Sequence, residues 1–136
     1  MVVLDTNVLS ALMNVRPEAR VLAWLDRQVN MAVWTSAVSI FELRRGVDGM
    51  PEGRKRRDLQ VRMERILEDV LADRILPVDR ESADVAGQLW AQRIRRGVPV
   101  SVEDTLIAGV VLARGATLAT RNTRHFPEVP VVNPWD

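Results

Sequence analysis

Four side chains with oxygen donors stand where apolar runs of the sequence give way to the next element. Asp5 ends the first apolar run, and Asn122 follows a later one in LATRNTRHF. Glu42 and Asp104 lie in the first turns of two expected helices, in SIFELRRG and SVEDTLIAG. Three carboxylates and an amide offer only hard oxygen donors, which suit Mg²⁺ or Mn²⁺ with water and phosphate as the remaining ligands. The chemistry that such a set predicts is metal-assisted attack of water on a phosphodiester.

Helix capping is the alternative explanation for the three acids. Ser39 with Glu42, and Ser101 with Asp104, have the spacing of a capping box, and Asp5 could cap the helix that follows it. Two carboxylates about 5 Å apart repel by on the order of 3 kcal/mol at an effective dielectric near 20. A cap contributes only about 1 kcal/mol. Caps alone would therefore not assemble such a cluster, whereas a shared cation would.

Alternating strands and helices are expected to position these residues. The hydrophobic pattern predicts strands at 2–4, 31–35, 74–78, 116–120 and 130–132, with helices after Asp5, from Pro17, at 39–49, 59–71 and 82–96, and from Ser101 to Arg114. Strands that alternate with helices form a parallel sheet covered on both faces. We expect an α/β fold of three α/β/α layers around a short parallel sheet of four to five strands. Ligands of such folds bind at the carboxyl ends of the strands.

Composition limits the function further. The chain has 136 residues, 47% of them hydrophobic, which predicts one domain over residues 1–136. It contains no cysteine, no basic leader and no long apolar span, so we expect a cytoplasmic protein without a membrane segment. The net charge of +1 is no signature of nucleic-acid binding, so any such surface must be local. The segment after the first strand lacks the G-x-G-x-x-G of dinucleotide binders, and no P-loop motif is present.

The order of these motifs resembles that of PIN domains, in particular the VapC-like toxins and their FitB-like branch. The matching segments are LDTNV, SIFELRRG, RILPVD, VEDTLIAG, LATRNTRHF and VVNPW, from Val2 to Trp135. The resemblance implies a Mg²⁺- or Mn²⁺-dependent endoribonuclease that is the toxin of a toxin–antitoxin pair. It assigns Asp5, Glu42, Asp104 and Asn122 to the catalytic set, with the metal held mainly by the two aspartates. The family often has Asp at the fourth position, so Asn122 puts a second metal in doubt.

Other residues are expected to support this set. Thr6 and Thr120 are candidate donors that orient the carboxylates, and Arg121 is a candidate contact to the substrate phosphate. Asn7 is interpreted as a turn residue. His125, the only histidine, is expected to pack within its loop rather than act as a base.

The resemblance also implies partners. These are an RNA substrate, a cognate antitoxin and a second copy of the chain, with DNA reached only through the antitoxin. The apolar residues of the helix predicted at 59–71 are expected to line a groove for the antitoxin. The alternative function is a catalytically weak or inactive PIN module that acts as antitoxin partner and transcriptional co-repressor. Asn122 is the feature that favours this alternative.

Overall fold

Five short parallel strands form the middle layer of the structure, a computed structural model that describes residues 1–29, 32–99 and 101–136. The strands are β1 (Val2–Leu4), β2 (Val33–Ser36), β3 (Ile75–Leu76), β4 (Thr117–Ala119) and β5 (Val131–Val132), in the order β3-β2-β1-β4-β5. Each neighbouring pair is parallel. The chain runs outward from β1 to β3 and then returns to place β4 on the other side of β1. This reversal makes the carboxyl ends of β1 and β4 the expected ligand site.

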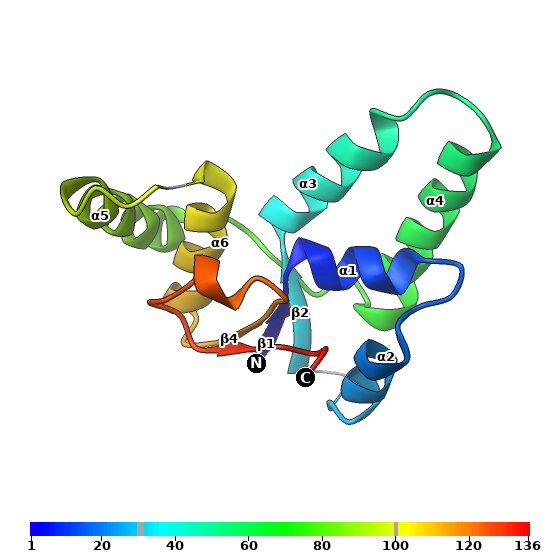
Figure 1. The fold of residues 1–136 in the computed structure, drawn as a ribbon, viewed down its shortest axis with the longest axis horizontal. Helices are drawn as coiled ribbons and strands as arrows, with labels where there is room; N and C mark the ends of the chain where they lie inside the picture. Colours follow the sequence, from blue (N-terminus) through cyan, green and yellow to red (C-terminus); the bar gives the residue numbers. More distant parts are fainter. Residues whose placement is uncertain (30–31, 100) are drawn as a thin grey trace.

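Helices cover both faces of the sheet (Figure 1). They are α1 (Thr6–Met13), α2 (Ala19–Asp26), α3 (Ala37–Asp48), α4 (Arg54–Arg65), α5 (Arg80–Arg95) and α6 (Val102–Ala113), with a π-helical turn η2 (Ile66–Val70) and a 3₁₀ turn η3 (Thr123–His125). Helices α1 to α4 lie on one side, and α5 and α6 on the other. The predicted three-layer fold is confirmed. No helix in the described part of the chain is long and apolar enough to cross a bilayer.

The two helical layers share the strands between them. Because successive side chains of a strand point to opposite faces, Leu4 and Ala119 belong to the core under α1 to α4. Their neighbours Val3 and Leu118 belong to the core under α5 and α6. All four side chains are fully buried. The positions that carry Asp5 and Thr120 are thereby fixed at the ends of two tightly packed strands.

Helix α3 begins earlier than predicted. It starts at Ala37 rather than Ser39, and its N-cap is Ser36, whose Oγ accepts a hydrogen bond from the Ser39 backbone N–H at 3.1 Å. The capping box of Ser39 and Glu42, the alternative explanation for this acid, is therefore not formed. Glu42 lies in the second turn, where its carboxylate is not needed by the start of the helix.

Every predicted strand except β1 has different bounds in the structure, β2 and β3 among them. Residue Met31, in the strand predicted at 31–35, lies outside the described residues, and β2 spans Val33–Ser36. The strand predicted at 74–78 is reduced to β3, because Pro77 has no N–H to donate to a neighbouring strand. The carboxyl end of β2 thus lies later than predicted, at Ser36, and that of β3 earlier, at Leu76.

The helix predicted at 59–71 is also different. Helix α4 begins at Arg54, before the predicted start, and continues into η2. Met63, Ile66 and Leu67 are buried in the core under α1 to α4, and Leu59 packs partly against it. Most of the apolar surface expected to remain free on this helix is thus used within the chain.

Helices α5 and α6 cross closely at Gly109. A Cβ atom there would lie 2.5 Å from the backbone oxygen of Ser82 and 2.7 Å from the Cβ of Ala86. We expect Gly109→Ala to lower the free energy of unfolding by about 1–3 kcal/mol, because the crossing would have to open. Gly87→Ala is the control: its Cβ would meet nothing within 4 Å, and it should stabilise α5 by about 0.5–1 kcal/mol. Urea denaturation compares the two, and equal midpoints would contradict the close crossing.

Candidate active site

Asp5 is held at the end of β1 by three side-chain and backbone donors. As N-cap of α1, its Oδ1 accepts the Thr6 backbone N–H at 2.8 Å. Its Oδ2 accepts the Thr120 hydroxyl at 2.8 Å and the Asn7 amide at 3.4 Å. The residue is only 5% exposed. The capping role is therefore real for Asp5, and its second oxygen is fixed by residues from α1 and from the end of β4.

The surroundings of Asp5 disfavour its negative charge. Burial raises its pKa from 3.8 to about 6, although hydrogen bonds from Thr120 and Thr6 act in the opposite direction. The negative charges of Asp104 and Glu42 raise this pKa further. A bound cation would reverse both effects, because it replaces lost hydration and offsets the repulsion.

Glu42 is connected to Asp5 through Thr6. The Thr6 hydroxyl lies 2.7 Å from Glu42 Oε1, to which it donates, and 3.0 Å from Ser39 Oγ. The backbone N–H of the same threonine donates to Asp5. One residue thus fixes two carboxylates, one after β1 and one on α3. The Glu42 side chain is 20% exposed, so it remains accessible to solvent.

Asp104 lies in the first turn of α6, where Ser101 is the N-cap. Ser101 Oγ accepts the Asp104 backbone N–H at 3.2 Å, and its hydroxyl lies 3.2 Å from Glu103 Oε2. The Asp104 carboxylate instead lies 3.2 Å from His125 Nδ1. Of the capping box that was the alternative explanation for Asp104, only the hydrogen bond to Ser101 is thus formed. The carboxylate of Asp104 is left for other contacts.

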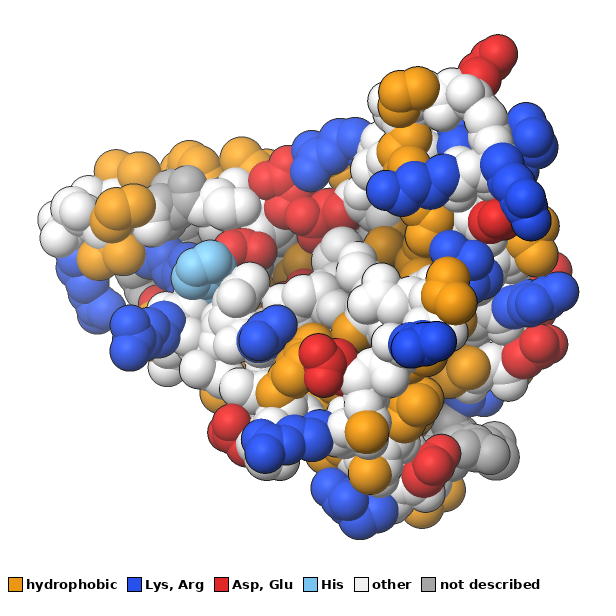
Figure 2. Space-filling model, turned by 45° about the vertical axis from the view of Figure 1, so that its right-hand side comes forward, with side chains coloured by type: hydrophobic (Ala, Val, Ile, Leu, Met, Phe, Trp, Pro, Cys, Tyr) orange, Lys and Arg blue, Asp and Glu red, His pale blue; other side chains and the backbone are white. Residues whose placement is uncertain are grey.

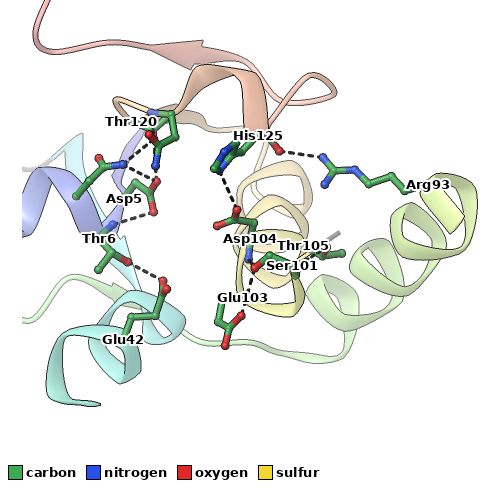
Figure 3. A network of polar contacts seen from close by, with 12 residues as sticks. Asp5, Thr6, Glu42, Arg93, Ser101, Glu103, Asp104, Thr105, Thr120 and His125 are labelled. Atoms are coloured by element: carbon green, nitrogen blue, oxygen red, sulfur yellow. Dashed lines mark hydrogen bonds and ion pairs between the residues drawn. The ribbon is translucent and has the colours of Figure 1, made fainter. Parts of the chain in front are cut away.

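The three carboxyl groups face one region between α1, α3 and α6 (Figure 3). In Figure 2, acidic side chains gather beside His125, while arginine and lysine side chains surround this face. Within the described residues, no three histidine, cysteine or acidic side chains are close enough to hold a metal ion unaided. The donors are nevertheless those that Mg²⁺ prefers, since it keeps several waters and binds proteins through one or two carboxylates. The raised pKa of Asp5 also fits a site that a cation would complete.

Asn122 and Arg121 lie at the edge of this region. The Asn122 backbone N–H donates to the Thr120 hydroxyl oxygen at 3.0 Å, and its side chain is exposed. Arg121 donates its backbone N–H to Asn7 Oδ1, while its guanidinium stands 5.0 Å from the centre of the Trp135 ring. Asn7 thus contacts Asp5, Thr120 and Arg121, which gives it more than the turn role expected from sequence.

Comparison with known proteins identifies the family to which this chain belongs. The PIN domain family model matches residues 2–132. The chain belongs to the PIN domain family. VapC ribonuclease Y4jK of Sinorhizobium fredii is 38% identical, over 100% of this chain and 99% of the relative. Toxin FitB of Neisseria gonorrhoeae is 36% identical, over 99% of each chain. A crystal structure of FitAcB from Neisseria gonorrhoeae has a TM-score of 0.88 at 36% identity and covers 99% of each chain.

Sequence reasoning missed one contact in this PIN domain, that of His125 with Asp104. The two residues are separated by a helix and a strand, and no local motif joins them. Turn η3, which follows β4, brings the imidazole back over the start of α6 (Figure 3). Arg93, buried on α5, donates to the His125 backbone oxygen at 3.1 Å and so fixes this path. The only available signal was the expected placement of the segment after β4 at the edge that carries Asp5.

Proposed function

We propose that this PIN domain is a Mg²⁺- or Mn²⁺-dependent endoribonuclease and the toxin of a toxin–antitoxin pair. The observation that carries the proposal is the buried Asp5, whose pKa is raised by burial and by Asp104 and Glu42. The negative charge of such a carboxylate is disfavoured by its surroundings, and a bound cation would stabilise it. The names of two full-length relatives, a VapC ribonuclease and a toxin, support the same activity.

Asp5 and Asp104 would hold the metal. When bound, a divalent cation polarises a phosphodiester and makes a water molecule more acidic. Glu42 would accept the proton of the attacking water, because its carboxylate is partly exposed and is oriented by the Thr6 hydroxyl. Thr120 would keep Asp5 in position through the hydrogen bond to Oδ2.

Asn122 and Arg121 have smaller proposed roles. Asn122 would offer a neutral oxygen at the rim, which favours one metal over two. Arg121 would reach a substrate phosphate only by leaving the Trp135 ring.

A groove between α1, α3 and α4 supports a protein partner. It has a volume of about 280 Å³ and is lined by Thr6, Met13, Glu42, Leu43 and Leu59, among others. Because Glu42 forms part of its wall, an apolar antitoxin segment seated there would also obstruct the carboxylates. We propose that inhibition works in this way, and that the protein reaches DNA only through the antitoxin.

A second copy of the chain is the other proposed partner. Phe41 on α3 and Val102 on α6 are each 56% exposed. Arg45 lies over the Phe41 ring at 5.2 Å and pairs with Glu103 at 3.3 Å, which places the two helices side by side. An apolar surface across two adjacent helices is suited to self-association.

Cleavage of end-labelled RNA tests the proposed activity. The purified protein should cleave in Mg²⁺ or Mn²⁺, stop in EDTA and recover when the metal is added in excess. A folded protein that cleaves no RNA with either metal would contradict the proposal. That result would favour the alternative function, an inactive PIN module that acts as antitoxin partner and co-repressor. The observation that favours this alternative is Asn122, which stands in place of an acid.

A further inference from the structure

A cavity of about 380 Å³ opens beside Asp104 and Ser101, the N-cap of its helix. It is lined by Val98, Pro99, Asp104, Arg124, His125 and Pro127, together with Arg93 and Ser101. The lining comes from the segment before α6, the first turn of α6 and the loop that contains η3. Asp104 therefore belongs both to this cavity, named here the His125 pocket, and to the group of carboxylates.

His125 has one contact through its ring and one through its backbone. Its Nδ1 lies 3.2 Å from Asp104 Oδ2, and its backbone oxygen accepts a hydrogen bond from Arg93 at 3.1 Å. Arg93 is itself only 5% exposed and pairs with Glu128 at 2.6 Å. This hydrogen bond holds the pKa of Glu128 below its usual value, so the pair stays charged. The imidazole is thus a flat surface on an anchored loop, with one ring contact to Asp104, and is about half exposed.

The chemistry of the walls selects a neutral, flat ligand over a phosphate. Val98, Pro99 and Pro127 are apolar, and Asp104 would repel an anion. The guanidinium of Arg93 already donates hydrogen bonds to Glu128 and to the backbone oxygen of His125. Arg124 is exposed and is the remaining cation of the lining, so a phosphate would be met at its side chain rather than among the apolar walls.

We propose that the His125 pocket binds one nucleobase of single-stranded RNA, stacked on the His125 ring, next to the phosphodiester that faces the carboxylates. The proposal deepens the proposed function and rests on it for the identity of the substrate. Bases of single strands are free to be splayed out and stacked on aromatic or histidine side chains. Stacking tolerates any base, and Arg124 would contact the adjoining backbone.

Binding of RNA without metal tests the pocket independently of cleavage. The probe is a fluorescein-labelled single-stranded RNA of about six nucleotides, titrated in EDTA and followed by fluorescence anisotropy. His125→Ala should raise the Kd about tenfold, the order of effect expected when one stacking partner is lost. His125→Phe keeps a flat ring and should stay within about threefold of the parent. Arg80→Ala, a control whose side chain is 95% exposed on α5, should bind as the parent does.

Several results would overturn the pocket. These are a parent that binds no single-stranded RNA, a His125→Ala variant that binds normally, and a His125→Phe variant as weak as the alanine variant. Normal RNA binding by His125→Ala with an altered mass in light scattering would show that the surface contacts protein instead. Binding that depends on the His125 ring, in a protein that cleaves nothing in Mg²⁺, would support the pocket and reject the nuclease. Circular dichroism establishes that both variants are folded.

Discussion

Asp104→Asn should abolish RNA cleavage while the protein stays folded. The substitution keeps the shape of the side chain and removes the charge that would hold the metal. Helix α6 keeps its cap, because Ser101 accepts the backbone N–H of residue 104 rather than contacting its carboxylate. If the metal stabilises the transition state by about 4 kcal/mol, its loss corresponds to a cleavage rate about a thousandfold lower. The measurement is kcat/KM on end-labelled RNA in Mg²⁺, with circular dichroism as the test of folding.

Glu103→Gln is the matched control for this experiment. Glu103 is the neighbouring acid in the same turn, but its carboxylate contacts Ser101 and Arg45 rather than His125. Its removal should leave cleavage within about threefold of the parent, since no metal ligand is lost. Strong cleavage by Asp104→Asn would remove Asp104 from the site. Equal loss in both variants would show that the charge of this helix end matters and not the position of one carboxylate.

The placement of the carboxylates was predictable because it depends on local pattern and on one topological rule. Asp5 follows a fully apolar strand, and β4 lies directly beside β1. Parallel strands that end at one edge therefore bring Thr120 against Asp5, as the 2.8 Å hydrogen bond shows. Thr6 was a candidate donor to the carboxylates, and it does contact two of them. Their catalytic roles remain predictions.

Other features could not be read from the sequence because they depend on competing local choices. Ser36 and Ser39 are both good N-caps, three residues apart, and the pattern around them favours neither. The packing of α3 decides between them: Ser39 is fully buried near the Thr6 hydroxyl, so the helix must begin before it. The contact of His125 with Asp104 likewise depends on the path of an irregular loop. That path is fixed by Arg93, a buried charge that a helical pattern would place on the surface.

Asp5→Asn should stabilise the metal-free protein at pH 7 although it abolishes cleavage. Asparagine is as good an N-cap as aspartate, and it removes a charge that the fold disfavours. The pKa of Asp5 is about 6 in the folded protein against 3.8 ordinarily. A difference of roughly 2 units corresponds to about 3 kcal/mol, the upper limit of the gain in unfolding free energy expected in EDTA. Excess Mg²⁺ should stabilise the parent in proportion to ln(1 + [Mg²⁺]/Kd) and should not stabilise the variant.

The dependence on pH separates this explanation from a general effect of the substitution. Because the folded state binds the Asp5 proton more tightly, the parent loses stability as pH rises from about 4 to about 6 and levels off above that. The difference in unfolding free energy between Asp5→Asn and the parent should therefore be large at pH 7 and should vanish near pH 4.

Asp79 is the control of opposite sign: hydrogen bonds from Ser82, and then from Arg114, lower its pKa to about 2. Asp79→Asn should destabilise the protein at pH 7, with a gap that closes only as pH falls below 4 toward 2. Urea denaturation in EDTA at several pH values measures both variants. An Asp5→Asn variant less stable than the parent at pH 7 would mean that the buried carboxylate is needed by the fold itself, and the case for a cation at this position would lose its main support.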